Sequence, residues 1–197
     1  MGTELLLRDR LLLLDDDGPA VRETGLATRP YVSATEPDWS RERLSRRRAK
    51  RGGEVGKHLL RCVRGYQAWR GRPGWLARGM RKFYAVKWRL WSTATASEVS
   101  LDADLGGGLM LPHPQGVVVH PRARIGPNCM LFQGVTLGTG GPKPGVPVLG
   151  GHVDVGCGAK LLGGIRVGDH AKIGANAVVL CDVPPGRTAV GVPARVV

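Results

Sequence analysis

The histidine at position 113 has the residue type and the surroundings that proton transfer requires. It lies in LMLPHPQG at residues 109–116, between Pro112 and Pro114, whose rings restrict the backbone on both sides. A neutral imidazole accepts a proton near neutral pH, so His113 could act as a general base that activates an acceptor hydroxyl for attack on a thioester. No Cys or Ser adjoins it, so we expect no covalent protein intermediate. A structural role is the alternative for a histidine that stands alone in the sequence.

Metal-ligating residue types are present, but their spacing does not match a metal site. His152 and His170 are separated by 18 residues and would stack on one face of a fold that repeats with that period. A metal-dependent hydratase is therefore one alternative, although the H-x4-H pair expected in such a site is missing. The cysteines form no C-x-x-C pair and no Cys/His cluster at zinc spacing: Cys62, Cys129, Cys157 and Cys181. We expect no metal, and we expect reduced thiols in a cytoplasmic protein.

A six-residue rhythm after residue 91 predicts the framework that would position His113. Ten aliphatic anchors recur every six positions, with one interval of twelve that preserves the phase: Val119, Ile125, Leu131, Leu137, Leu149, Val155, Leu161, Val167, Ile173 and Val179. Glycine dominates the position after each anchor, where a side chain would clash at a tight corner or φ must be positive. Four residues after each anchor the side chains are apolar and mostly small, and the next position is mostly polar. A helix with 3.6 residues per turn cannot keep this phase.

These positions describe one side of a triangular prism, with an inward anchor, a corner, a small inward residue and an outward polar one. Three hexapeptides make a coil of 18 residues, and stacked coils lie about 4.8 Å apart, the spacing of hydrogen-bonded strands. We therefore predict a mainly β fold, a left-handed parallel β-helix of hexapeptide repeats over residues 98–197, with an N-terminal α-helical cap. Three prolines exclude residues 138–148 (GTGGPKPGVPV) from the regular coils, so this segment should protrude as a loop at a binding face.

The first half of the chain carries most of the charge. The formal net charge is +13, but residues 41–89 hold seventeen basic and two acidic side chains, against eight and six in residues 90–197. We interpret residues 41–97 as a basic α-helical cap whose aromatic face packs on the β-helix while its arginines stay solvated. Nucleic-acid or membrane-surface binding is the alternative, and we expect neither partner. Residues 1–40 show no extended periodicity and are expected to be disordered or loosely attached.

Four segments resemble the serine O-acetyltransferase branch of the hexapeptide-repeat acyltransferases. They are GLMLPHPQGVVVHPRARIGPN, FQGVTLGTGG, VGCGAKLLGGIRVGDHAKIGANAVVL and the closing DVPPG…AVGVPARVV, and the match runs over residues 98–197, half of the chain. The resemblance implies a left-handed β-helix capped by helices, assembled as a homo-trimer or a dimer of trimers, with CoA between adjacent prisms. It also implies transfer of an acetyl group from acetyl-CoA to a small hydroxyl acceptor. L-serine is the best match, which would place the reaction in cysteine biosynthesis.

By the same resemblance, His113 takes the place of the catalytic base. Six residues match positions that hold CoA, either by backbone along the pantetheine arm or by side chains at the phosphates: Gly138, Thr139, Ala159, Ala177, Lys172 and Arg195. Acetyl-CoA is thus the expected co-substrate.

The acceptor side of the resemblance is weaker. Family members support the histidine with an aspartate in a V-D-I-H-P segment, where this chain has Ser100. Asp102 or Asp104 could replace it as the orienting carboxylate, and without one the imidazole would be a weaker base. Pro112 stands where aspartate usually precedes the histidine, and residues 145–147 (GVP) replace an R-H-P that helps to hold serine. An O-acetyltransferase for a sugar or another hydroxylated metabolite is therefore the nearest alternative, followed by a non-catalytic scaffold or a nucleic-acid binder.

Overall fold

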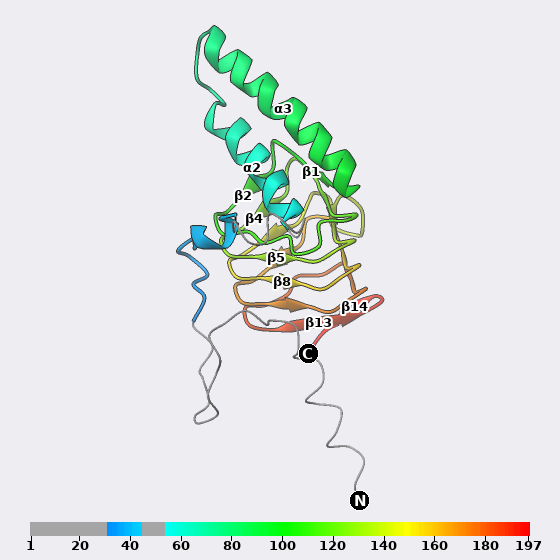
Figure 1. The fold of residues 1–197 in the computed structure, drawn as a ribbon. Helices are drawn as coiled ribbons and strands as arrows, with labels where there is room; N and C mark the ends of the chain where they lie inside the picture. The colour runs from blue at the N-terminus through cyan, green and yellow to red at the C-terminus, as the bar shows by residue number, and fades with distance from the viewer. Residues whose placement is uncertain (1–30, 45–53) are drawn as a thin grey trace, which may run out of the picture. The chain divides into compact units, whose positions relative to one another are not determined.

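A computed structural model describes residues 31–44 and 54–197, and it contains a three-sided prism of parallel strands (Figure 1). Sheet A holds β1 (Glu98–Val99), β3 (Val118–Val119), β6 (Thr136–Gly138), β9 (Lys160–Leu162) and β12 (Val178–Val179). Sheet B holds β2 (Asp104–Leu105), β4 (Arg124–Ile125), β7 (Val148–Leu149) and β10 (Arg166–Val167). Sheet C holds β5 (Met130–Leu131), β8 (Asp154–Val155), β11 (Lys172–Ile173), β13 (Thr188–Gly191) and β14 (Ala194–Val196). The predicted left-handed β-helix with an α-helical cap is confirmed.

Each strand is short because a coil side offers only one outward residue before the next inward anchor. In β4, for example, Arg124 is exposed and Ile125 is buried. All ten anchors named above are buried, and the small residues four positions after them fill the space between anchors of neighbouring sides. β13 and β14 end the stack as an antiparallel hairpin, in which Val190 lies opposite Arg195.

Six anchors are followed by glycine, and at all of these except Gly138 the glycine is explained by close approach and not by a positive φ. A Cβ on Gly126 would lie 2.4 Å from the carbonyl carbon of Gly150 in the next coil, closer than any real Cβ can come. Positive φ falls two residues later in the corner, at Asn128 (59°), His152 (53°) and His170 (60°). Of the two reasons that the sequence offered for these glycines, the steric one is therefore correct. The left-handed conformation is placed on residues that include Asn, which tolerates it better than most.

Two corners of the prism are longer than the rest. In the first coil, sides A, B and C begin at Glu98, Asp104 and Met110, which are six residues apart; Met110 is placed on side C by its bridge to Met130. The next side begins eight residues after Met110, at Val118. The corner between sheets C and A, called the CA corner here, thus carries two extra residues in the first coil. The AB corner is lengthened in the third coil, where twelve residues separate the starts of β6 and β7. The extended CA corner thus precedes the strands of sheet A, and the extended AB corner follows them.

Two helices close the N-terminal end of the prism, as Figure 1 shows. They are α2 (Val55–Ala68) and α3 (Trp75–Thr95), separated by the break at residues 72–74. Leu59, Leu60 and Val63 of α2 are buried and belong to the same apolar core as the anchors. The expectation that the aromatic face packs on the prism holds only for part of α3. Trp88 and Trp91 lie against the core, whereas Trp75 and Phe83 are exposed.

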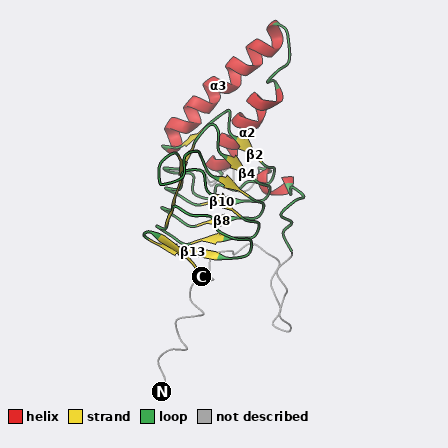
Figure 2. Cartoon of the chain, turned by 180° about the vertical axis from the view of Figure 1, so that it is seen from behind, coloured by secondary structure: helices red, strands yellow, loops and turns green. Residues whose placement is uncertain are grey.

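Residues 33–44, called the strap here, run along the BC corner and include the 3-10 helix η1 (Trp39–Glu42) (Figure 2). The buried side chain of Asn128 accepts a hydrogen bond from the Asp38 N–H and donates to the carbonyls of Ser33 and Glu36. The expectation of loose attachment is therefore wrong for residues 33–40. The sequence missed these contacts because they depend on one amide about ninety residues away. The remainder of that expectation, residues 1–30, lies outside the described residues, as does much of the basic run at 45–53.

An ion pair joins the strap to the cap. Arg64 of α2 contacts Glu42 at 2.9 Å and also donates to the backbone carbonyls of Leu105 and Gly106. Within the ranges 31–44 and 54–197, no helix has the length and apolar character needed to cross a membrane.

Candidate functional site

His113 lies on the extended CA corner, where the two extra residues carry it out of the regular coil. The corner is fixed at both ends, because Leu111 and Pro114 are buried while His113 is exposed. Gly116 closes it with a φ of 69° and donates its N–H to the carbonyl of Ala96, the C-cap residue that follows α3. The helical cap therefore supports the corner directly.

Above His113, the later coils continue the CA corner as a ridge of small and amide side chains. Gln115, Gln133 and Cys157 occupy equivalent positions, joined by backbone hydrogen bonds from Gly134 to Gln115 and from Gly158 to Gln133, each 2.8 Å long. Gln115 and Gln133 are exposed and Cys157 is half-buried. The two glutamines were not among the predicted site residues, although their spacing of 18 residues can be read from the sequence.

Two of the residues expected at the pantetheine arm lie just beyond this ridge on sheet A. Ala159 and Ala177 stand one coil apart with fully buried side chains, and the N–H of Lys160 donates to the Ala177 carbonyl at 2.8 Å. Because both alanine side chains point inward, a ligand on this surface of sheet A would contact their backbone atoms and the side chains of the outward-facing neighbours. Lys160 supplies a cation at this place, held by the Gly134 carbonyl at 2.6 Å and by Thr136 Oγ1 at 3.1 Å. It was not among the predicted site residues.

The predicted loop at residues 138–148 does protrude, from the AB corner. It is tied down by Lys143, whose Nζ lies 2.8 Å from Asp182 Oδ2. That hydrogen bond, followed by one from the Arg166 N–H, lowers the pKa of the Asp182 carboxyl. Gly163 lies beneath the loop, where a Cβ would come within 2.4 Å of the Gly140 carbonyl. Gly138 and Thr139 begin this loop.

The site residues predicted from the sequence are thus divided between the two ends of sheet A. His113, Ala159 and Ala177 lie at its CA end, and Gly138 and Thr139 lie at its AB end. Lys172 lies on the outward side of β11 and Arg195 on β14, so both are exposed on sheet C. One chain by itself does not unite these groups into a single cleft.

Both candidate carboxylates have an arginine partner in the described part of the chain. Asp102 lies in the AB turn, with Oδ1 3.3 Å from Arg70 Nη1 of the cap. Asp104 lies on β2, with Oδ2 3.9 Å from Arg124 Nε. Ser100 accepts a hydrogen bond from the Asp102 N–H and so caps the same turn. Both carboxylates thus have basic partners of their own, and the assignment of Asp102 or Asp104 as the group that orients the imidazole stays a prediction.

The two histidines expected to stack do so at the BC corner. His152 Nδ1 and His170 Nδ1 are 2.9 Å apart and the rings meet edge to face. Burial lowers the pKa of His152, and the nearby His170, Arg41 and Lys172 lower it further, while Asp154 opposes them. Across residues 31–44 and 54–197, no three His, Cys, Asp or Glu side chains are grouped so that they could hold a metal ion.

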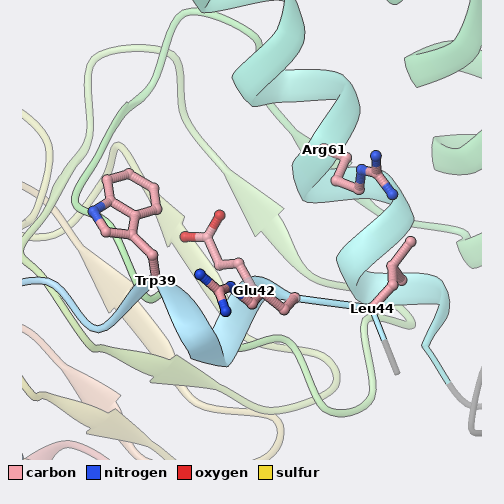
Figure 3. A pocket seen from close by; sticks show the side chains of 5 residues that line it. Trp39, Glu42, Leu44 and Arg61 are labelled. Atoms are coloured by element: carbon pink, nitrogen blue, oxygen red, sulfur yellow. The ribbon is translucent and has the colours of Figure 1, made fainter. Parts of the chain in front are cut away.

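A shallow pocket of about 480 Å³ opens between the strap and α2 (Figure 3). Its lining comes from the strap and one helix residue: Trp39, Glu42, Arg43, Leu44 and Arg61. The Glu42 carboxylate is already bound by Arg64 and by the N–H of Leu109, and the other lining residues include no His, Cys or Asp. We therefore do not include it in the candidate site.

The similarities to known proteins agree with the repeat pattern. The chain is 46% identical to serine acetyltransferase from Helicobacter pylori over 149 residues, which is 72% of this chain and 81% of that protein. Soybean serine acetyltransferase solved with serine superposes with a TM-score of 0.62 at 36% identity, covering 73% of this chain and 57% of that one. The Brucella abortus enzyme solved with coenzyme A also gives 0.62, at 34% identity, over 73% and 56%. No protein-family model matches. The chain thus spans most of the Helicobacter protein and little more than half of the other two.

Proposed function

The chain belongs to the serine acetyltransferase family, and on that premise we propose that it transfers the acetyl group of acetyl-CoA to the hydroxyl of L-serine. The observation that carries this proposal is the extent of the Helicobacter match, which covers 72% of this chain and therefore reaches beyond the length of the prism alone. Solved relatives hold serine, the proposed acceptor, and coenzyme A, the product that remains when acetyl-CoA gives up its acetyl group. The free, unpaired state of all four cysteines supports a reducing, cytoplasmic location.

His113 would act as the general base in this reaction. Its imidazole takes the proton of the serine hydroxyl as the oxygen attacks the thioester carbonyl, and the imidazolium then protonates the departing CoA sulfur. The exposed position of His113 on its extended corner allows this approach, and backbone N–H groups of the neighbouring coils would hold the acyl group. No nucleophilic side chain is needed, because the hydroxyl attacks directly.

We further propose that the complete site forms between subunits of a homo-trimer. His113 and the alanine row lie at the CA end of sheet A, while Gly138 and Thr139 lie at the AB end, so one prism cannot present both to the same CoA molecule. Packing the CA corner of one prism against the AB loop of the next brings the two halves together. Lys172 and Arg195, exposed on sheet C, would then be available to the CoA phosphates.

The test of the reaction is release of free CoA from acetyl-CoA with L-serine as acceptor. Replacing His113 with Ala should lower kcat by about 10²- to 10⁴-fold with little change in CoA affinity measured by calorimetry. His170→Asn is the matched control and should retain turnover. His170 lies at the BC corner, away from the CA corner of His113, and its left-handed backbone conformation is one that Asn tolerates. Unchanged turnover in His113→Ala would remove this residue as the base. Turnover with sugars and none with serine would replace serine as the acceptor.

The shared site has its own test. Chains carrying His113→Ala and chains lacking loop residues 140–146 should each be inactive alone. Mixed trimers should recover part of the turnover, because some interfaces then combine an intact corner with an intact loop. Absence of recovery in trimers shown by mass to be mixed would mean that each chain completes its own site.

A further inference from the structure

Helix α3 is apolar on two opposite faces, and the rest of the described chain covers only one of them. With 100° between successive residues, Ala77, Tyr84, Trp88 and Trp91 form one face, turned toward α2 and the prism. The opposite face carries large side chains exposed over more than half of their surface: Trp75 (84%), Leu76 (53%), Phe83 (51%), Val86 (62%) and Leu90 (66%). A helix that packs on one side needs only one apolar stripe, so the second stripe is not explained by the fold.

The outer stripe is continuous. Leu76, Phe83 and Leu90 follow one another at seven-residue intervals, and Trp75 and Val86 fill the adjacent row. The stripe extends over 16 residues, about 24 Å of helix. Single exposed apolar residues are normal on protein surfaces, but an aligned row of five large ones marks a surface that contacts something apolar.

The charges around the stripe are all of one sign. Arg78, Lys82 and Arg89 border it on one side and Lys87 on the other, with the Lys87 ammonium 5.2 Å from the centre of the Phe83 ring. Residues 55–97 contain ten basic side chains and no acidic one. The surface therefore combines an apolar row with an uninterrupted cationic border.

This combination discriminates between possible occupants. A second copy of α3 would cover the apolar row but would bring like charges together with no carboxylate to compensate them. A nucleic acid would neutralise the cations but leave the apolar row in water. The surface of an anionic bilayer satisfies both, since phosphate headgroups attract the cations while the apolar row enters the boundary between headgroups and acyl chains.

Within residues 31–44 and 54–197, the position of α3 leaves this face accessible. In both views α3 is the outermost element at its end of the prism (Figures 1 and 2). Its 21 residues extend about 32 Å, long enough to lie flat along an interface. We propose that the outer face of α3 binds the surface of an anionic lipid bilayer, with the helix parallel to the surface. Membrane-surface binding by the cap is the alternative that the sequence analysis left open.

The test is co-sedimentation of the full-length chain with phosphatidylcholine vesicles, with and without phosphatidylglycerol. The chain should partition at least about tenfold more strongly onto the anionic vesicles, and added salt should weaken that preference. Phe83→Gln with Leu90→Gln should weaken partitioning by about a hundredfold, because two large apolar side chains no longer leave water. Val192→Gln, at a position 71% exposed and remote from α3 in the sequence, is the matched control and should bind like the wild type.

A second pair of variants separates the two contributions. Lys82→Glu with Arg89→Glu leaves the apolar row intact and should abolish the preference for phosphatidylglycerol. Trp75 should be quenched by lipids brominated on the acyl chain, and this part of the signal should vanish in Trp75→Phe.

Three outcomes would overturn the proposal. One is equal partitioning of the wild type and the Phe83/Leu90 variant. Another is a halving of the molar mass in that variant with no vesicle binding by either protein, which would make the stripe a contact between copies. The third is loss of binding to a DNA duplex in the Phe83/Leu90 variant together with unchanged vesicle binding. None of these readouts depends on turnover, so they stand or fall separately from the proposed reaction.

Discussion

The side chain of Asn128 is expected to hold the strap in place, and its contribution can be calculated bond by bond. It makes three hydrogen bonds to the strap, one accepted from the Asp38 N–H and two donated to the Ser33 and Glu36 carbonyls, each 2.8 Å long. At about 1 kcal/mol net for each, Asn128→Ala should weaken docking of the strap by about 3 kcal/mol. The Asp38 N–H should then exchange with solvent about 150-fold faster, since 1.4 kcal/mol corresponds to a factor of about ten.

Asn128→Gly separates the hydrogen bonds from the backbone conformation. Asn128 has a φ of 59°, which costs alanine about 1 kcal/mol and glycine nothing. Both variants should therefore release the strap equally in hydrogen exchange, while only Asn128→Ala should also lower the melting temperature of the prism. Exchange at the Lys160 N–H, which donates to Ala177 inside the prism, is the internal reference. If Asp38 exchanged at the wild-type rate in either variant, the strap would be held by contacts other than this amide.

Three further predictions concern the loop, the thiols and the histidine pair. Asp182→Asn should remove the ion pair with Lys143, so that proteolysis within residues 139–145 accelerates while the melting temperature changes little. Iodoacetamide should label the exposed Cys181 first and Cys157 next, and should spare Cys129, because burial raises the pKa of its thiol to about 12; mass spectrometry of timed samples would reveal any other order. Because burial lowers the pKa of His152, the unfolded chain takes up the proton at a higher pH than the folded one, and stability should fall as pH drops below about 6.5. Denaturant midpoints across this range should shift less in His152→Asn, and equal shifts would show that other groups control the acid sensitivity.

The repeat made the prism predictable from the sequence, whereas the cap was predictable only in part. The ten anchors recur at six-residue intervals and occupy equivalent environments. Ten weak local signals therefore reinforce one another and define both the fold and the side of each strand that faces inward. The outer stripe of α3 could not be assigned in that way. Apolar residues on two faces of a helix look alike in the sequence, and only packing distinguishes the buried Ala77 from the exposed Phe83.

Long-range polar contacts account for most of what sequence reasoning missed at the site. Asp102, a candidate to orient His113, donates its N–H to Ser100 within a turn and has its carboxylate beside Arg70 of the cap. The strap depends on Asn128, whose role follows from its left-handed corner position and not from any pattern in residues 33–44. Neither contact leaves a local signature, because each joins segments more than thirty residues apart.

The two extra residues at the CA corner give a direct test of why His113 stands where it does. In the next coil the same corner reads LFQGV at residues 131–135, with Gly134 matching Gly116 in its positive φ. Deleting Pro112 and Pro114 would leave LHQGV, which restores an 18-residue coil and places the imidazole where Phe132 stands in the coil above.

The hydrogen bonds of the corner can still form in this variant, because Gly116 keeps its position relative to Ala96 and Gly134. We therefore expect the melting temperature to remain within a few degrees of the wild type. The imidazole would be drawn back toward the regular coil, by several ångströms for two residues removed from an extended corner. A displacement of about 1 Å can already cost about a hundredfold in rate, so kcat should fall by at least that factor. If this variant folds and retains its turnover, the extension of the corner has no part in catalysis.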